Sequence, residues 1–255
     1  MRNDPGTLVA SQGDPILIEF SARPRRSQAQ MVRQVCERLE ESYGRPRLGN
    51  PRRPLDDLLF ILMSNRTAPK VAIATYRSLK ERFPRWDVLA EARVADIERV
   101  LRPAGLALKK ARQLSGIAKR LREDFGRVTL SPLRCLPDAD VLAYLRRLPG
   151  VSTKVAYCVM MYTMDREVLP VDVHVHKICS RLGWISKKRA DQSHEVLAML
   201  VPSHRRFAFH VGCIALGRKV CTPSKPNHHR CPIRKYCEHA AREHEEKERR
   251  QAPGR

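Results

Sequence analysis

The sequence predicts an all-α fold, and three observations support this prediction. Apolar residues recur at the i, i+3, i+4, i+7 spacing of a single helix face in segments spread over the chain. Residues that break helices, mainly Pro and Gly, separate these segments. No segment shows the alternation of a half-buried strand, and no repeat with a fixed period is present.

Each expected helix follows from its own pattern. The three clearest apolar faces are Val32, Val35, Cys36 and Leu39; Leu114, Ile117, Ala118 and Leu121; and Val175, Ile178, Cys179 and Leu182. We expect further helices over residues 55–63, 69–83, 95–101, 138–147, 153–162, 192–201 and 205–216. Residues 1–28 mix Pro, Gly, Ser and Arg around an apolar patch at 16–20 and predict a flexible or loosely docked arm. Residues 240–255 form a charged tail, which we expect to be a solvated helix end.

The net charge of the chain indicates what kind of molecule it binds. The 49 Lys and Arg against 27 Asp and Glu give a formal net charge of +22, which favours a polyanion such as nucleic acid. The longest apolar run, residues 155–162, is too short to cross a bilayer, so we expect no membrane segment. The first residues lack the apolar core of a secretory signal, and we expect a cytoplasmic protein.

A tight turn over residues 148–152, Leu-Pro-Gly-Val-Ser, carries the first chemical signal. A turn of this kind between two helices exposes backbone N–H groups that can hold one phosphate of a nucleic-acid strand. Lys154 follows on the next helix, and an unprotonated lysine amine is a nucleophile. Asp172 precedes a helical segment that Gly183 would end, so it is expected to cap that helix. A carboxylate held there can also stabilise a sugar cation.

These motifs, LPGVSTKVA and VDVHVHK, resemble the helix-hairpin-helix DNA glycosylases of the HhH-GPD superfamily, and most of all the endonuclease III branch. The resemblance runs over residues 32–238, and 18 residues separate the lysine from the aspartate, as in that branch. It implies that Lys154 attacks C1′ of a damaged nucleotide flipped out of the duplex, while Asp172 stabilises the sugar cation. It places DNA contacts at Asn65, Arg66, Leu106, Leu148, Gly150, Val151, Ser152 and His174.

Two of these positions depart from the family pattern. Asn65 stands where the branch usually has a glutamine that fills the gap left by the flipped base, so Arg66 is an alternative gap filler. Ser152 replaces the second glycine of the turn, which is compatible with phosphate binding if the backbone there does not need a positive φ. Leu106 takes the place of an apolar wedge, although it could equally pack against its neighbours.

The cysteines form the second chemical signal. Of eight cysteines, five are scattered and expected to be buried reduced thiols, Cys213 among them. The resemblance aligns Cys221, Cys231 and Cys237 with three positions of the C-x6-C-x2-C-x5-C iron-sulfur motif, and His228 with the remaining one. It implies a [4Fe-4S] cluster with mixed ligation, while three thiolates and an imidazole would also suit tetrahedral zinc, and a lost site whose cysteines only pack is the remaining alternative. His229 is an alternative ligand.

The architecture implied by the resemblance is two helical domains that flank a DNA-binding cleft. Residues 54–166 would form a central domain with the hairpin, and residues 29–53 with 167–255 a second domain that carries the cluster loop. The expected function is a DNA glycosylase with AP lyase activity, acting as a monomer on double-stranded DNA that contains an oxidised pyrimidine or an abasic site, in the cytoplasm with the nucleoid. Two alternatives stay open: a monofunctional mismatch glycosylase, and a non-catalytic DNA-binding module with a structural metal site.

Overall fold

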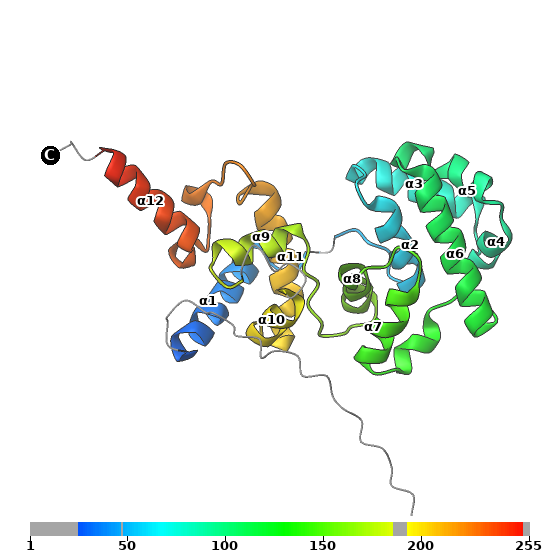
Figure 1. Cartoon of the computed structure of the whole chain (residues 1–255), viewed down its shortest axis with the longest axis horizontal. Coiled ribbons are helices and arrows are strands. Elements are labelled where there is room, and N and C mark those ends of the chain that lie inside the picture. Colours follow the sequence, from blue (N-terminus) through cyan, green and yellow to red (C-terminus); the bar gives the residue numbers. More distant parts are fainter. Residues whose placement is uncertain (1–24, 47, 186–192, 252–255) are drawn as a thin grey trace, which may run out of the picture.

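The computed structural model describes residues 25–46, 48–185 and 193–251, and this part of the chain is helical without any strand. The all-α expectation is therefore confirmed. The helices form two lobes that lie beside one another along the long axis of the molecule (Figure 1). Most of the expected N-terminal arm, including the apolar patch at 16–20, lies outside the described residues.

The first lobe contains the middle of the chain. Its helices are α2 (Pro54–Ser64), α3 (Pro69–Arg82), α4 (Trp86–Glu91), α5 (Val94–Leu101), α6 (Ala107–Phe125), α7 (Asp138–Arg147) and α8 (Thr153–Thr163). Helix α6 packs against α4 and α5, and α2 packs against α8. They share one hydrophobic core, in which Leu58, Ile117 and Val159 are completely buried. This core positions the N-terminus of α8, where Lys154 stands.

The second lobe joins the two ends of the described chain. It consists of α1 (Arg25–Tyr43), α9 (Val173–Arg181), α10 (Ser193–Leu200), α11 (Arg206–Lys219) and α12 (Glu238–Gln251). Helix α11 packs against both α1 and α9 around a separate core that includes Val35, Ile178 and Phe209. Residues 44–53 and 164–172 connect the lobes, and the second connection leads directly to Asp172.

Local signals explain most helix boundaries. Pro54 and Pro69 occupy the first turns of α2 and α3, where a missing N–H costs nothing. Gly183 adopts a φ of +78° just after α9, the left-handed conformation that ends a helix most readily with glycine. Helix α4 was not expected, because its six residues are too few to show a helical period. Helix α1 begins at Arg25, inside the segment expected to be an arm.

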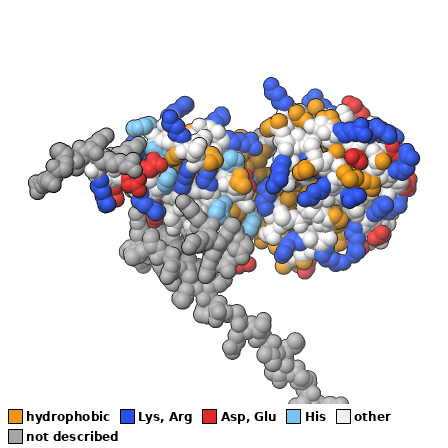
Figure 2. All heavy atoms as spheres, turned by 45° about the horizontal axis from the view of Figure 1, so that its top comes forward, with side chains coloured by type: hydrophobic (Ala, Val, Ile, Leu, Met, Phe, Trp, Pro, Cys, Tyr) orange, Lys and Arg blue, Asp and Glu red, His pale blue; other side chains and the backbone are white. Residues whose placement is uncertain are grey.

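Basic side chains dominate the visible surface. Figure 2 shows Lys and Arg side chains over both lobes, including the boundary where the lobes meet. Within the described ranges, no helix is both long and apolar enough to span a membrane. The boundary between the lobes is therefore a basic surface, and it is here that the expected catalytic residues lie.

Candidate active site and cysteine loop

A cleft of about 580 Å³ lies between the two lobes, and its wall includes both expected catalytic residues. Lys154 comes from the first turn of α8 and is half-buried. Asp172 comes from the connection that enters α9, on the other side. Four further expected DNA-contacting residues line the same cleft, namely Asn65, Arg66, Ser152 and His174. The structure thus brings together residues that are up to about a hundred positions apart in the chain.

Asp172 is held by the helix that it caps. Its Oδ1 atom accepts hydrogen bonds from the backbone N–H groups of His174 and Val175, each at 2.9 Å. The expectation of an N-cap at this position is confirmed. Because both bonds are to Oδ1 and come from the rigid first turn of α9, the carboxylate has a defined direction at the cleft wall.

A half-buried tyrosine and a completely buried histidine also line the cleft, and sequence reasoning missed both. The Tyr162 hydroxyl and Nε2 of His210 lie 2.6 Å apart, and Nδ1 of His210 lies 2.9 Å from the carbonyl oxygen of Pro170. Since that carbonyl can only accept, Nδ1 carries the proton and Nε2 accepts from the tyrosine. Burial lowers the pKa of His210 to about 4, although the Asp172 carboxylate opposes the shift. Through these two hydrogen bonds, the neutral His210 ring connects α8, α11 and the segment that leads to Asp172.

Asp57 is a second buried ionisable group near the cleft that the sequence did not single out. It is completely buried on α2, and Asn50 Nδ2, at the cleft wall, donates to its Oδ1 at 2.6 Å. Burial raises the pKa of Asp57 to about 7, while the bond from Asn50 and the charge of Lys154 act in the opposite direction. Its Oδ2 is buried and has no hydrogen-bond partner within the described structure. The carboxyl group is thus energetically unfavourable in its ionised form.

The helix-hairpin-helix turn lies between α7 and α8, next to the cleft. Gly150 has a φ of +79°, and a Cβ atom there would lie 2.1 Å from Nε2 of Gln113 on α6. The side chains of Leu148 and Val151 are buried in the core of the first lobe, so only their backbone groups can form hydrogen bonds to a phosphate. Ser152 has a φ of −86°, and the condition for a serine at this position is met. Its Oγ accepts from Val155 N–H at 3.4 Å and caps α8. Unlike Ser152, the four preceding turn residues do not line the cleft.

Leu106 stands at the edge of the first lobe and does not line the cleft either. Its backbone adopts a left-handed φ of +51°, and 55% of the side chain is exposed. The alternative that Leu106 packs against its neighbours is therefore wrong, because a packed leucine would be covered. Below it, Lys110 Nζ donates to Thr67 Oγ1 and to the Ala104 carbonyl oxygen, each at 2.8 Å. This buried bridge holds the loop of Leu106 to the loop that follows Asn65, and burial lowers the pKa of Lys110.

His174, on α9, packs against α11 within the second lobe. A Cβ atom at Gly217 would lie 2.5 Å from its Nδ1, so the ring packs directly on that glycine of α11. Burial lowers the pKa of His174, with the Asp172 carboxylate acting in the opposite direction. A neutral ring at the cleft wall can offer hydrogen bonds without adding charge.

The cysteine loop lies in the second lobe. Cys221, Cys231, Cys237 and His228 line one small cavity, together with Arg181. The exposed His229 does not line it, so the geometry favours His228 as the fourth donor. Cys213 is completely buried in the core of this lobe, as expected. Cys36, Cys158 and Cys179 are buried too, whereas Cys135 is exposed, so the expectation of a buried thiol is wrong at that position.

The donors in this loop suit a cationic centre. Burial raises the pKa of Cys231 to about 11, and the nearby Cys221 thiol adds to the shift. Burial also raises the pKa of Cys237. Arg181 Nη1 donates to Cys221 Sγ at 2.9 Å, and its backbone oxygen accepts from Cys237 Sγ at 3.5 Å. Three thiols and an imidazole are donors that an iron-sulfur cluster or zinc accepts. No three of these four donors lie within 4.8 Å of one another in the described structure, which is closer to the spacing around a cluster than to the spacing around a single zinc ion.

Comparison with known proteins establishes the family. The profile of the HhH-GPD superfamily base excision DNA repair protein matches residues 59–203, which is more than half of the chain. The chain therefore belongs to the HhH-GPD superfamily of base excision DNA repair proteins. A second profile, the iron-sulfur binding domain of endonuclease III, matches residues 221–237. Within the superfamily the protein is endonuclease III-like, with the iron-sulfur domain of that branch.

Several relatives share this similarity over different lengths. The chain is 27% identical to endonuclease III of Thermotoga maritima over 208 residues, which are 82% of this chain and 92% of that protein. It is 34% identical to a candidate DNA glycosylase of Arabidopsis thaliana, over 68% of this chain but only 59% of the relative. The match to the DNA glycosylase/AP lyase ROS1 of Arabidopsis thaliana, 29% identical, covers 61% of this chain and 12% of that protein.

Solved structures show the same fold. A non-covalent complex of endonuclease III with DNA matches with a TM-score of 0.74 at 20% identity, over 85% of this chain and 98% of the other. A thermostable thymine-DNA glycosylase matches with a TM-score of 0.69 at 18% identity, over the same shares of the two chains. At these identities the likeness concerns the fold.

Proposed function

We propose that the protein is a base-excision DNA glycosylase with AP lyase activity. The observation that carries this proposal is the single cleft in which Lys154 and Asp172 lie on opposite walls, each presented by a helix N-terminus. A flipped nucleotide of a damaged duplex is the substrate that such a cleft between two basic lobes would accept. We propose an oxidised pyrimidine or an abasic site as the lesion.

The first step would be displacement of the base. Lys154 Nζ, as the free amine, forms a bond to C1′ while the N-glycosidic bond breaks and its electron pair leaves with the base, which takes up a proton. Positive charge develops on the sugar at this stage. Asp172, with its direction set by the cap of α9, stabilises that charge and accepts the proton released by the amine.

The second step would cut the strand. The nitrogen lone pair forms a double bond to C1′ while the C1′–O4′ bond breaks and O4′ takes up a proton, which gives a protonated Schiff base between Lys154 and C1′. Removal of a C2′ proton then expels the 3′ phosphate with the electron pair of the C3′–O bond, which is a β-elimination. Water finally hydrolyses the Schiff base and restores the lysine.

DNA recognition would come from three places around the cleft. Backbone N–H groups of the turn that contains Gly150 bind a phosphate, because the buried Leu148 and Val151 side chains fix the turn. The exposed Leu106 enters the base stack from the minor groove. Arg66 at the cleft wall reaches the space of the flipped base, where the shorter Asn65 reaches less far.

We also propose that Cys221, His228, Cys231 and Cys237 hold a [4Fe-4S] cluster. When bound, the cluster would cross-link a loop that has little apolar surface of its own to bury. The same loop and the end of α11 before it carry basic residues that would then face DNA in a fixed arrangement, namely Lys219, Lys225, Arg230, Arg234 and Lys235. Visible absorption together with iron and sulfide analysis of the purified protein distinguishes this cluster from zinc.

Borohydride trapping on an abasic duplex tests the lyase. Wild type should form a covalent complex, Lys154→Ala should form none, and the exposed Lys119→Ala on α6 should trap like wild type. Asp172→Asn should lower base release by about 100-fold or more while DNA binding persists. An untrapped wild type that releases a base without cutting the strand would establish a monofunctional glycosylase instead. A wild type inactive on a panel of single-lesion duplexes and indifferent to Asp172→Asn would leave only a DNA-binding module.

A further inference from the structure

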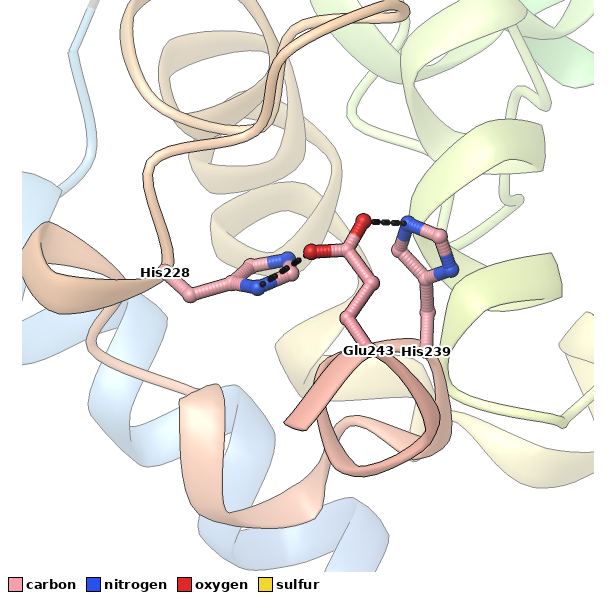
Figure 3. A group of neighbouring side chains, drawn as sticks. All are labelled: His228, His239 and Glu243. Atoms are coloured by element: carbon pink, nitrogen blue, oxygen red, sulfur yellow. Dashed lines mark ion pairs between the residues drawn. The ribbon is translucent and has the colours of Figure 1, made fainter. Parts of the chain in front are cut away.

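His228 in the cysteine loop is linked to the C-terminal helix through a carboxylate (Figure 3). Nδ1 of His228 lies 3.3 Å from one carboxylate oxygen of Glu243, and Nε2 of His239 lies 3.1 Å from the other. Glu243 and His239 are one turn apart on α12, so a single helix face presents both. The three side chains therefore form a His–Glu–His chain that begins at the position where the family has a cysteine.

His228 faces two environments. Besides its contact with Glu243, it lines the cavity that Cys221, Cys231 and Cys237 share. The 3.3 Å contact with Glu243 is an ion-pair contact at Nδ1. A proton held on Nδ1 by this carboxylate leaves the lone pair of the neutral ring on Nε2, which is the tautomer that a metal bound at Nε2 requires. A histidine that binds a metal regularly donates its other N–H to a carboxylate, which fixes the ring and makes it a stronger donor.

We propose that Glu243 is a positioning residue of the iron-sulfur site, which orients and polarises His228 as the fourth cluster ligand. This inference rests on the cluster proposed above. It also accounts for how a histidine can replace a cysteine there. A neutral imidazole supplies one negative charge fewer than a thiolate, and the carboxylate behind it returns that charge to the site.

Helix α12 begins beside the turn after α9 and directly after the last cysteine of the loop. Its first residue, Glu238, packs on the turn after α9, since a Cβ atom at Gly183 would lie 2.2 Å from Oε1 of Glu238. The backbone N–H of Ala241 donates to the carbonyl oxygen of Cys237 at 3.1 Å, so the helix starts directly from the last cysteine. The segment expected to be a solvated tail thus places Glu243 six residues after Cys237, within contact distance of His228.

The test compares cluster loading and cluster loss in four variants and wild type, all purified without oxygen. Iron and sulfide per chain are measured, and the visible absorption is followed after an iron chelator is added. Glu243→Gln should lose the cluster about tenfold faster than wild type. Glu246→Gln, an exposed glutamate on the same helix, should behave like wild type. His228→Cys should retain the cluster, and Glu243→Gln should have no added effect in the His228→Cys background. Thermal unfolding verifies that every variant is folded.

The outcomes separate this inference from the cofactor proposal. A wild type that holds iron and sulfide but loses them no faster after Glu243→Gln overturns the role of Glu243 and leaves the cluster in place. An equal effect of Glu243→Gln in the His228→Cys background also overturns it, because the glutamate would then act only through the helix. A wild type without iron and sulfide overturns both proposals. Zinc bound in addition to the cluster and lost in Glu243→Gln would assign the three side chains to a metal of their own.

Discussion

Replacing Asp57 by asparagine should change how the stability of the protein depends on pH. The folded state keeps a proton on this carboxyl group up to a pKa of about 7, whereas an ordinary aspartate has a value of 3.8. Between these values the folded protein binds more protons than the unfolded chain. The contribution to the free energy of unfolding is therefore fully present below 3.8 and is lost as the pH rises through about 7.

The size of the effect follows from that difference. A gap of about 3 pKa units corresponds to about 4 kcal/mol over the full pH range, and to about 2.5 kcal/mol between about pH 5 and pH 8. Asp57→Asn removes this dependence and keeps an oxygen that can accept from Asn50. The variant should therefore gain about 2.5 kcal/mol relative to wild type on going from about pH 5 to pH 8.

Urea unfolding of both proteins at the two pH values measures this double difference. The pKa of His210, lowered to about 4, makes the free energy of unfolding fall as the pH drops below about 6.5, but this effect is common to both proteins and cancels. The exposed Asp140→Asn on α7 provides the matched control and should show almost no change. A double difference near zero for Asp57→Asn would refute the assignment of a raised pKa to this buried group.

Three other substitutions probe the cleft and its surroundings. Leu106→Gly should raise the free energy of unfolding by about 0.5 to 1 kcal/mol, because glycine adopts the left-handed backbone of this position without strain. The same variant should bind an abasic-site duplex more weakly in fluorescence anisotropy. An unchanged affinity would contradict the role of Leu106 as a wedge. Tyr162→Phe should lower the free energy of unfolding, measured in urea, by about 1 to 2 kcal/mol, because Nε2 of His210 loses the hydroxyl that donates to it. An unchanged free energy of unfolding would show that water replaces the hydroxyl. Gly150→Ala should weaken DNA binding and lower the free energy of unfolding together. Adding Gln113→Ala removes the steric clash but leaves the positive φ, so it should restore the free energy of unfolding only in part. Full restoration would show that backbone strain at residue 150 plays no role.

The parts of the site that depend on neighbouring residues could be predicted from the sequence. Asp172 caps α9 through N–H groups two and three positions away, so a short stretch of sequence is enough to predict the cap. The positive φ of Gly150 is likewise a local property of a tight turn. The apolar periods predict the long helices for the same reason, whereas α4, with six residues, has no period to detect.

The parts that depend on burial could not be predicted in this way. His210 contacts Tyr162 and Pro170, which are 48 and 40 positions away, and no spacing rule connects them. Asp57 looks like an ordinary first-turn acid of α2, and only the packed structure shows it to be fully covered. Glu243 lies in a segment so rich in charge that composition predicts solvent exposure, although its carboxylate reaches the cysteine loop. In each case the packing of another segment of the chain sets the environment of the ionisable group.

The second lobe, which joins α1 to the helices after residue 172, imposes an order on folding during synthesis. Arg205 pairs with Glu37 at 3.3 Å, and α1 packs on α11, so this core closes a loop of 168 residues. The first lobe is continuous in the chain and can form while the ribosome is still adding the remainder. Until α11 emerges, α1 has no partner for its buried face of Val32, Val35 and Leu39. We therefore expect the newly made chain to expose this apolar helix through most of its synthesis, and a chaperone that binds nascent chains to contact it first.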